Sequence, residues 1–479
     1  MNKKFKKILI FSLISLSLFG CENLNTNTKN PNPKTEVEPE VTCSLCEKLP
    51  TAQKVVIDEL DAHVPTTFKS ESVTIDTLQL HEGVIQKTYT FTKNNGKTSK
   101  VVVTEVDLAY ANIAAGTTEN SFSNITKSVP IKQATSYENA NPGTNVVTAV
   151  NGDFFGGNSC VNAFVKDSII IKNSHNDRGI YDYKNLDADI PASMPMLFGV
   201  SGTTAQVAPI IKDASVKDTI QAKLYYEVEI TNENNKTTLA EGITFNNAEG
   251  SDTLINVLTD EDGIGTALPG SKVLSIKKHP TDSTRMHGEI TEITEILGSS
   301  LYHANEDYFY IIIPENSSFT NYNIGDLVSY NVTSSDGTWR YYDTIIGCRQ
   351  ALVINGEIAS TVSKENSNGA QATNIPRTSV GIMPNGNVCI FSVEALSYGN
   401  KLLTNETNGL SLPELADFMR YYGVYSGANF DGGGSTQLIT KNPQTNEFEV
   451  TVRSSDYGTY VLENSRPVIN TLLVYVKEK

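Results

Sequence analysis

The sequence predicts an α+β fold, in which a β-rich mixed sheet is flanked by helices and a small β module is nested in the middle of the chain. Three observations lead to this prediction. Short runs of alternating polar and apolar residues, separated by turn signals, fill most of the chain. A few continuous apolar runs indicate strands that are buried on both faces. Apolar residues at helical spacing follow residue 411, which adds at least one helix.

The first 20 residues predict a signal peptide. Lysines cluster before an uncharged run from Ile8 to Gly20, and 13 residues are too few to span a bilayer as a helix. Leu18-Phe19-Gly20-Cys21 resembles the bacterial lipobox, which implies a lipid on Cys21 and a membrane-anchored, extracytoplasmic lipoprotein. Ordinary secretion with cleavage nearby is the alternative. Residues 21–50 are polar and predict a disordered tether.

The charge balance argues against nucleic acid as a partner. The chain has 38 Lys and Arg against 54 Asp and Glu, a net charge of −16. Removing the leader removes four lysines and no acid, so the charge becomes −16 − 4 = −20. Such a surface repels phosphate backbones. Any anionic substrate must therefore meet positive charge that is concentrated locally.

No residue pattern predicts a metal or a cofactor. Cys43 and Cys46 form a CxxC, but a second pair that could complete a zinc site is missing from the sequence. The six histidines are scattered without metal-ligand spacing. Asp260–Gly263 is similar to the start of a calcium loop, but Ser271 stands where the loop needs its glutamate. We therefore expect neither a metal nor a cofactor.

Residues 51–204 and 343–479 are predicted to form one domain, and residues 205–342 the nested β module. Val55–His63 predicts a short helix. Val84–Ala111 contains two alternating runs around Asn94-Asn95-Gly96, which predicts a hairpin. Val146–Val150 is continuously apolar and predicts a strand buried on both faces.

A helix, a strand and a glycine loop follow one another in the C-terminal third. Ser411-Leu412-Pro413-Glu414 is a capping box, and Gly423 is well placed to end the helix that it starts. Val424–Asn429 predicts a short strand. The loop Asp431-Gly432-Gly433-Gly434-Ser435-Thr436 comes directly after it. This order places Asp431 at the exit of a strand.

The glycine loop has the composition of an anion site. Successive glycine N–H groups can form an anion-binding concavity, and Asp431 can serve as a base, a nucleophile or a cation partner. A carboxylate beside a bound anion suggests phosphate-ester chemistry. The alternative is a flexible turn without chemistry.

Three other predicted strands carry polar residues at one end. Asn151-Gly152-Asp153 follows the buried strand at Val146–Val150. Arg377-Thr378 starts a hairpin whose return strand stops at Glu394, and Arg466 opens the last strand. Each feature alone is typical of a turn or of a solvated side chain.

The order of these motifs resembles the phosphodiester glycosidase family. The motifs are Asn-Gly-Asp-Phe-Phe, Arg-Thr-Ser-Val-Gly-Ile, Gly-Leu-Ser-Leu-x-Glu-Leu-Ala, Asn-Phe-Asp-Gly-Gly-Gly-Ser-Thr and Arg-Pro-Val-x-Asn. The resemblance runs from about Val84 to Val474. Glu394 stands where the family more often has an aspartate, and Ser465 replaces the usual glutamate before Arg-Pro. An inactive homologue is therefore an open alternative.

The resemblance implies hydrolysis of the bond between a sugar's anomeric carbon and a phosphate oxygen. Its carbohydrate partner would be a sugar phosphodiester of the N-acetylglucosamine type or an envelope glycan, and the membrane would be reached through the lipid. The implied catalytic residues are Asp153, Asp431 and Glu394. The implied substrate-binding residues are Asn151, Arg377, Thr378, Gly432, Gly433, Gly434, Ser435, Thr436 and Arg466. In this scheme the two arginines clamp the phosphate, because a guanidinium donates two parallel hydrogen bonds to it.

Two other functions remain open from the sequence. One is a surface lipoprotein that binds glycans or phosphate without catalysis. The other is a phosphodiesterase that cleaves the P–O bond instead of the C–O bond.

Overall fold

The computed structural model describes residues 60–118, 125–172, 196–209, 224–232, 236–239, 243–245, 247–259, 263–279, 287–305, 307–334, 337–362, 372–396 and 407–477. The chain divides into two units, Met1–Ser44 and Leu45–Lys479, and the described residues all belong to the second. The predicted leader, Cys21, the tether and most of the helix predicted at Val55–His63 lie outside the described residues.

The described residues are mostly β-strand, so the predicted α+β fold is wrong. Within them the α-helices are α1 (Pro130–Ala140) and α3 (Leu412–Tyr422), of 11 residues each. Nearly all of the strands lie in antiparallel sheets. The reason is local. Most alternating runs are followed at once by a turn, so each run pairs with its neighbour in a hairpin instead of leading into a helix.

An eight-stranded antiparallel sheet, which we call the large sheet, carries two of the predicted motifs. Its order is β1 (Thr74–His81), β2 (Val84–Thr92), β3 (Thr98–Val106), β26 (Val388–Glu394), β25 (Arg377–Ile382), β27 (Ser426–Asn429), β23 (Ala351–Ile354) and β24 (Glu357–Ile358). The predicted hairpin is confirmed, since Thr92 pairs with Thr98 across a turn in which Gly96 has a φ of +78°. Positive φ explains the glycine there.

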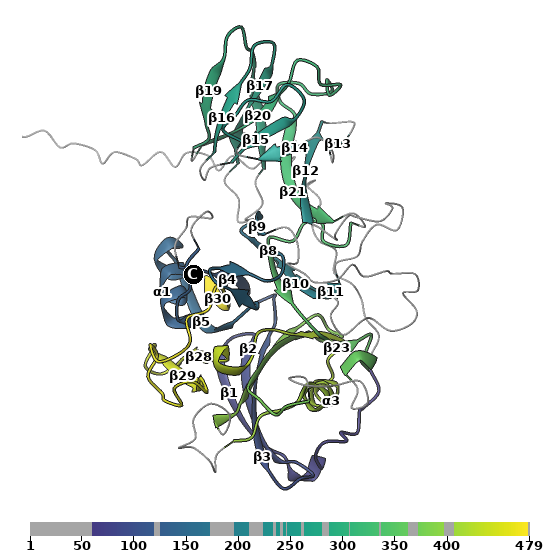
Figure 1. Ribbon diagram of the computed structural model, residues 1–479, viewed down its shortest axis with the longest axis vertical. Coiled ribbons are helices and arrows are strands. Elements are labelled where there is room, and N and C mark those ends of the chain that lie inside the picture. Colours follow the sequence, from purple (N-terminus) through teal and green to yellow (C-terminus); the bar gives the residue numbers. More distant parts are fainter. Residues whose placement is uncertain are drawn as a thin grey trace, which may run out of the picture. The chain divides into compact units, whose positions relative to one another are not determined.

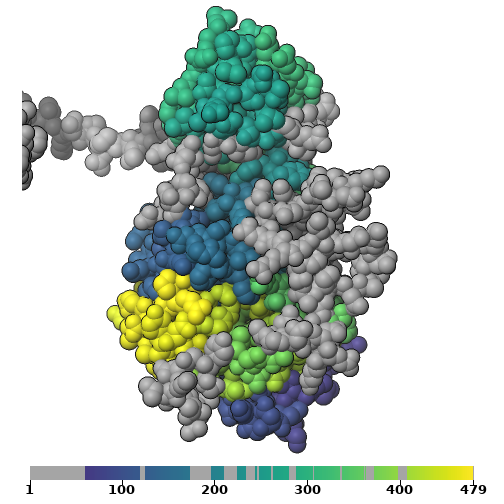
Figure 2. Space-filling model, viewed as in Figure 1, coloured from purple at the N-terminus to yellow at the C-terminus, as the bar shows by residue number. Residues whose placement is uncertain are grey.

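A five-stranded antiparallel sheet, the small sheet, lies beside it in the fold. Its order is β29 (Phe448–Val452), β28 (Leu438–Lys441), β5 (Thr144–Asn151), β30 (Thr471–Lys477) and β4 (Asn112–Gly116). The predicted buried strand is confirmed, because Val146–Val150 is buried throughout β5. Figure 2 shows the yellow C-terminal residues against blue residues of the first third of the chain, as the pairing of β30 with β4 and β5 requires.

The two α-helices pack on different sheets (Figure 1). Helix α1 contacts the small sheet, and α3 contacts β23 and β24 of the large sheet. The predicted capping box of α3 is confirmed: Ser411 accepts from the Glu414 N–H, and Glu414 accepts from the Ser411 N–H. Gly423 ends the helix with a φ of +97°. Neither helix is long and apolar enough to cross a membrane.

A third antiparallel sheet has five short strands, β11 (Thr204–Pro209), β10 (Met196–Ser201), β22 (Thr344–Cys348), β8 (Phe164–Lys166) and β9 (Ile169–Lys172). A two-stranded ribbon, β6 (Phe155–Gly156) and β7 (Ser159–Cys160), precedes β8 along the chain. Short 3₁₀ turns lie at η2 (Ser70–Ser72), η3 (Ser360–Val362) and η4 (Gly433–Ser435). The last of these is the predicted glycine loop.

The middle of the chain forms a sheet of its own (Figure 1, teal and green). Its order is β13 (Lys236–Leu239), β12 (Leu224–Thr231), β21 (Leu327–Ser334), β18 (His287–Glu295), β17 (Lys272–Lys278), β20 (Tyr308–Ile313), β15 (Ile255–Leu258) and β14 (Ile243–Phe245). Strands β16 (Ile264–Ala267) and β19 (Ser300–His303) form a separate ribbon. The cores of this region contain residues between Val228 and Tyr330 only. The domain boundaries stay a prediction.

Candidate functional site

The large and small sheets are joined where β5 and β27 end. The Asn151 side chain donates to the Asp431 carbonyl at 2.7 Å and accepts from the Thr378 hydroxyl at 2.7 Å. The Asp431 N–H donates to the Gly152 carbonyl at 3.1 Å. Thr378 also contacts the Thr436 hydroxyl at 3.3 Å. Three of the predicted motifs therefore meet at one place, although up to 280 residues separate the bonded residues in the chain.

The glycine loop is held tightly by the rest of the protein. Gly432 donates to its neighbour Asp431 at 2.9 Å, and Gly433 donates to the Pro376 carbonyl at 2.9 Å. The N–H groups of Ser435 and Thr436 bond to the carbonyls of Gly432 and Gly433. These four N–H groups point at protein oxygens, so they do not form the open anion cradle that the sequence suggested.

Close packing explains two of the three glycines. A Cβ on Gly434 would lie 2.2 Å from a carboxylate oxygen of Asp456 and 2.4 Å from the Arg466 guanidinium. A Cβ on Gly432 would lie 2.8 Å from the Pro376 carbonyl. Gly433 has a φ of +61°, which favours glycine.

Asp153 is a buried carboxyl group that faces Asn162. The Asn162 N–H donates to one of its oxygens at 2.9 Å, and the Asn162 side-chain amide donates to the other. Its own N–H donates to the Asn470 side chain at 2.9 Å. Burial raises the pKa of Asp153 to about 8; Asn162 and Lys172 oppose the shift, and the nearby charge of Asp431 adds to it. At neutral pH this carboxyl group is therefore largely protonated.

Asp431 is the more exposed of the two acids, and two arginines lie within electrostatic range of it. Burial raises its pKa above the ordinary value. The nearby Ser435 hydroxyl and the hydrogen bond from the Gly432 N–H oppose this, as do the positive charges of Arg466 and Arg349. Two neighbouring acids that both have raised pKa values are more frequent at functional sites than elsewhere in a protein.

The two predicted phosphate-binding arginines already have protein partners. Arg377 is 5% exposed, and its guanidinium donates to the carbonyls of Leu410 and Thr373 at 3.1 Å each. Arg466 is partly exposed and donates to the Asp456 carboxylate at 2.9 Å. Both lie beside the glycine loop, as the contacts of Gly432 and Gly434 show.

Arg349 is a third arginine at this place, and sequence reasoning missed it. It follows β22 directly, and its Cζ lies 4.8 Å from the centre of the Phe154 ring, next to Asp153 in the chain. A signal was present, because Thr344–Cys348 is a buried strand that ends in the polar pair Arg349-Gln350. The motifs at Asn151, Arg377 and Arg466 likewise place polar residues at one end of a strand.

Glu394 lies in a different environment from the two aspartates. Its carboxylate accepts from the Arg453 guanidinium at 3.1 and 3.2 Å and from the Thr407 hydroxyl at 3.2 Å, and Lys100 lies 3.8 Å away. Arg453 and Lys100 lower its pKa against the effect of burial. Within the described residues it makes no contact with Asp153 or Asp431, so this acid is the buried centre of an ion-pair cluster with Arg453 and Lys100.

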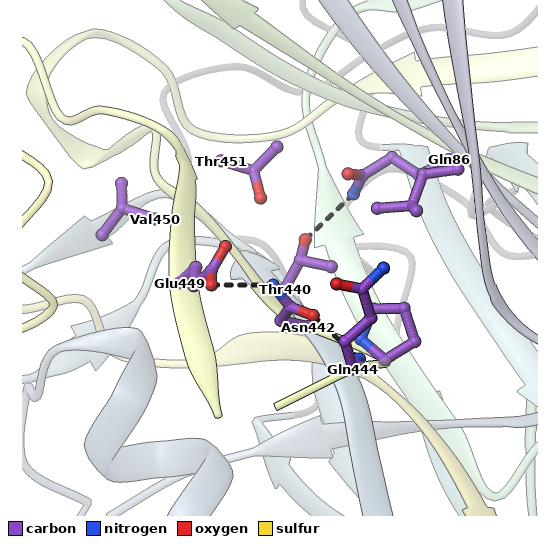
Figure 3. A pocket seen from close by; sticks show the side chains of 9 residues that line it. Gln86, Thr440, Asn442, Gln444, Glu449, Val450 and Thr451 are labelled. Atoms are coloured by element: carbon purple, nitrogen blue, oxygen red, sulfur yellow. Dashed lines mark hydrogen bonds between the residues drawn. The ribbon is translucent and has the colours of Figure 1, made fainter. Parts of the chain in front are cut away.

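A cavity of about 350 Å³ lies away from these residues, between β1, β2 and the β28–β29 hairpin. Figure 3 shows Gln86 bonded to Thr440, and Asn442 bonded to Glu449, in its wall. The candidate site does not contribute to this cavity. In the described part of the chain no group of three or more His, Cys, Asp or Glu side chains is placed to hold a metal ion.

The structure brings together two acids with raised pKa values, a fixed loop and several cationic side chains at the ends of β-strands. Residues 303–475 match the family model described as phosphodiester glycosidase. The resemblance seen in the motifs is thereby confirmed, and the matched part contains Arg349, Arg377, Asp431 and Arg466 but not Asp153. The family points to a glycosidase, a class of hydrolase.

Solved structures with a similar fold come from several organisms. A hypothetical protein from Synechocystis is 14% identical (TM-score 0.43), covering 85% of this chain and 65% of its own. A candidate exported protein from Burkholderia pseudomallei K96243 is 12% identical (TM-score 0.44; 88% and 100% covered). The zebrafish N-acetylglucosamine-1-phosphodiester alpha-N-acetylglucosaminidase catalytic domain, auto-inhibited by its pro-peptide, is 11% identical (TM-score 0.39; 89% and 98% covered). No curated protein sequence matches this chain.

Proposed function

We propose that this protein is an exported hydrolase that cleaves the anomeric C–O bond of sugar-1-phosphodiesters, releasing free sugar and a phosphomonoester. The observation that supports it most is the pair Asp153 and Asp431, two acids with raised pKa values beside the glycine loop of a phosphodiester glycosidase family match. N-acetylglucosamine is the first sugar to test, because the zebrafish relative is described as acting on it.

In the proposed mechanism Asp431 acts on the sugar. Its ionised carboxylate stabilises or attacks the oxocarbenium-like anomeric carbon as the C–O bond breaks. The electron pair leaves with the phosphate oxygen. Water supplies the hydroxyl group for the sugar and a proton for the phosphate. A phosphate monoester is a good leaving group, so it needs neutralisation of charge more than a proton.

Asp153 has a supporting part in this proposal. Because burial holds its proton at neutral pH, it does not add a second negative charge beside Asp431. Its neutral carboxyl group leaves Asp431 as the charged member of the pair. Glu394 is proposed to stabilise the fold through Arg453 instead of acting on the substrate.

Turnover of a defined substrate tests the function. The chain lacking its first 21 residues is incubated with an N-acetylglucosamine-1-phosphodiester, and free reducing sugar is measured. We expect Asp431→Asn to lower kcat on the order of 10³-fold or more. Asp76→Asn, which changes an exposed acid of β1, is the matched control and should act like the wild type. Binding without release by the wild type would instead indicate a non-catalytic binding protein.

The bond that breaks is identified in ¹⁸O-labelled water. Cleavage of the C–O bond places the label in the released sugar. Label in the phosphate would show a phosphodiesterase that cleaves the P–O bond, and would overturn the glycosidase proposal.

We also propose that the protein is a lipoprotein anchored through Cys21, with its domain outside the cytoplasm facing envelope glycans. The support is the lipobox-like sequence after a basic, then apolar leader. Cys21→Ala should move the protein from the membrane fraction to the soluble or secreted fraction. An unchanged distribution would contradict lipid anchoring.

A further inference from the structure

A substrate with a phosphate needs a cation in this acidic protein, and the two predicted arginines are already engaged. The Arg377 guanidinium is buried against the carbonyls of Leu410 and Thr373. Arg466 is held by the Asp456 carboxylate, which must be displaced or shared before a phosphate can use the same N–H groups. A cationic side chain other than Arg377 and Arg466 is therefore needed to bind the phosphate.

Arg349 lies between the ends of the two strands that carry the acids. Its N–H donates to the Asn429 carbonyl at 2.9 Å, and the Asn429 N–H donates to the Gln350 carbonyl at 2.9 Å. Asn429 is the last residue of β27, two positions before Asp431. These two bonds fix the backbone of Arg349 beside the exit of β27.

The side chain of Arg349 reaches towards the other acid. Its Cζ lies 4.8 Å from the centre of the Phe154 ring, directly after Asp153. A guanidinium over an aromatic ring is attracted to the face of the ring without using its N–H hydrogen-bond donors, which can still bind an anion. Arg349 is partly exposed, and across the described residues its guanidinium makes no ion pair and no hydrogen bond.

The positive charge of Arg349 acts on Asp431, the acid proposed to react with the sugar. Burial raises the pKa of Asp431, and the charges of Arg466 and, less strongly, of Arg349 oppose this, which places both guanidinium groups within electrostatic range of that carboxylate. A cation so placed can neutralise a phosphate that is bonded to a sugar at Asp431. It would act most strongly on the dianion that forms as the C–O bond breaks.

We propose that Arg349 is the principal phosphate-binding residue of the site, and that it binds the phosphate through its guanidinium N–H groups while the Phe154 ring holds the guanidinium in place. This inference rests on the proposed function for the identity of the substrate. The binding itself does not depend on turnover. Arg377 is then a structural residue, and Arg466 holds the glycine loop and Asp456 in place.

Titration with inorganic phosphate, followed by calorimetry, tests the proposal without catalysis. Arg349→Gln should weaken phosphate binding about tenfold or more, and Arg349→Lys should restore part of it because the charge returns without the planar fork. Lys132→Gln removes one positive charge from an exposed position of α1 and should leave the affinity unchanged. Thermal unfolding of each variant checks that it folds.

Two results would overturn the proposal. One is an Arg349→Gln variant that is folded and binds phosphate as well as the wild type. The other is equal weakening by Lys132→Gln, which would show only a general charge effect. If phosphate binding requires Arg349 but no sugar phosphodiester is cleaved, the proposed function is wrong, and Arg349 is still part of a phosphate-binding site.

The kinetics of sugar-phosphodiester cleavage test the role of Arg349 a second time. If the proposed function holds, Arg349→Gln should lower kcat/KM for the sugar phosphodiester on the order of 10²–10³-fold, as expected for loss of a preorganised charge donor. If the wild type is active and Arg349→Gln has the same kcat/KM, Arg349 does not bind the phosphate of the substrate. The glycosidase activity would still be established.

Discussion

Asp153 and Glu394 are both buried carboxyl groups, but their surroundings shift their pKa values in opposite directions. Both carboxyl groups are 1% exposed. Asp153 has only neutral donors in direct contact, and burial raises its pKa to about 8. Glu394 is bonded to Arg453 and lies near Lys100, and these cations lower its pKa below the ordinary value. A buried carboxylate stays charged only where a cation compensates for lost solvation.

The raised pKa of Asp153 predicts a pH dependence of stability. The folded protein keeps this proton up to about pH 8, whereas the unfolded chain loses it near pH 4. Rising pH therefore favours the unfolded state across this window, by at most about 1.4 kcal/mol per pH unit from this one group. In Asp153→Asn that contribution is absent, so the free energy of unfolding should fall less between pH 5 and 8.

Urea denaturation at four pH values in this range measures the effect. Other groups titrate too, so the comparison is the difference in slope between the wild type and Asp153→Asn. The exposed-acid variant Asp76→Asn should keep the wild-type slope. Identical slopes in all three proteins would mean that Asp153 is ionised at neutral pH.

Glu394 gives the opposite prediction, a loss of stability without a loss of chemistry. Glu394→Gln removes the buried carboxylate that Arg453 and Lys100 contact, and should lower the free energy of unfolding by about 3–5 kcal/mol. The kcat of the folded enzyme should stay within about threefold of the wild type, because Glu394 does not contact the two aspartates. Urea denaturation and kinetics below the unfolding transition measure both quantities. A stable variant with a large loss of kcat would make Glu394 catalytic.

At the scale of elements, the 3₁₀ turn η4 is fixed from both sides. Gly433 donates to Pro376 before β25, and the Ser454 hydroxyl donates to the Gly434 carbonyl at 2.6 Å. Arg466 and Asp456 pack directly on Gly434. The turn joins segments that precede β25, follow β29 and precede β30, so small changes in it are transmitted to the position of Asp431.

We predict that Gly434→Ala damages the site more than the fold. Its Cβ would meet Asp456 at 2.2 Å, so the Asp456–Arg466 pair has to shift. We expect kcat/KM for the sugar phosphodiester to fall at least about tenfold, and stability to fall by about 1–3 kcal/mol. Kinetics and thermal unfolding measure the two effects.

Gly156→Ala is the matched control for Gly434→Ala. Gly156 lies close to Asp153 in the chain, yet a Cβ there has no neighbour within 4 Å. This variant should retain wild-type kinetics. Equal activity in the Gly434→Ala and Gly156→Ala variants would show that the packing of η4 does not position Asp431.

At the scale of the molecule, the sheet of the middle region and the two sheets that carry the site have separate hydrophobic cores. The cores of the middle region contain residues from Val228 to Tyr330. The largest core joins residues from Phe68 to Val476 and includes none of them. A third cluster, with Leu224, Val332 and the buried Trp339, connects the two regions at the base of β12 and β21.

Separate cores predict separate unfolding. Ile276→Ala removes a fully buried side chain of the middle region, and Ile390→Ala removes one of the large sheet. Each should destabilise its own region by about 2–5 kcal/mol. Amide hydrogen exchange, followed segment by segment, should accelerate in 224–334 for the first variant and in the large and small sheets for the second. Acceleration of both regions by either variant would show a single cooperative unit.

The sequence by itself determined the local elements and the place of the acids. The hairpin at Asn94–Gly96, the buried strand β5, the capped helix α3 and the strand before Asp431 all follow from patterns within about a dozen residues. The family resemblance also came from motif order alone. The predicted fold class was wrong, because a run of alternating residues does not indicate whether it pairs with the next strand in a hairpin or leads into a helix.

The tertiary structure alone decided which charged side chains are available. Arg377 meets the carbonyl of Leu410, 33 residues away, and Glu394 meets Arg453, 59 residues away. Arg349 stacks on Phe154 from the other half of the chain. Charge and hydrogen-bonding capacity depend on partners brought together by folding, and a motif contains only its own residues. The sequence therefore pointed to Asp431 and Asp153 as candidates, whereas only the folded chain brings Arg349 close to them.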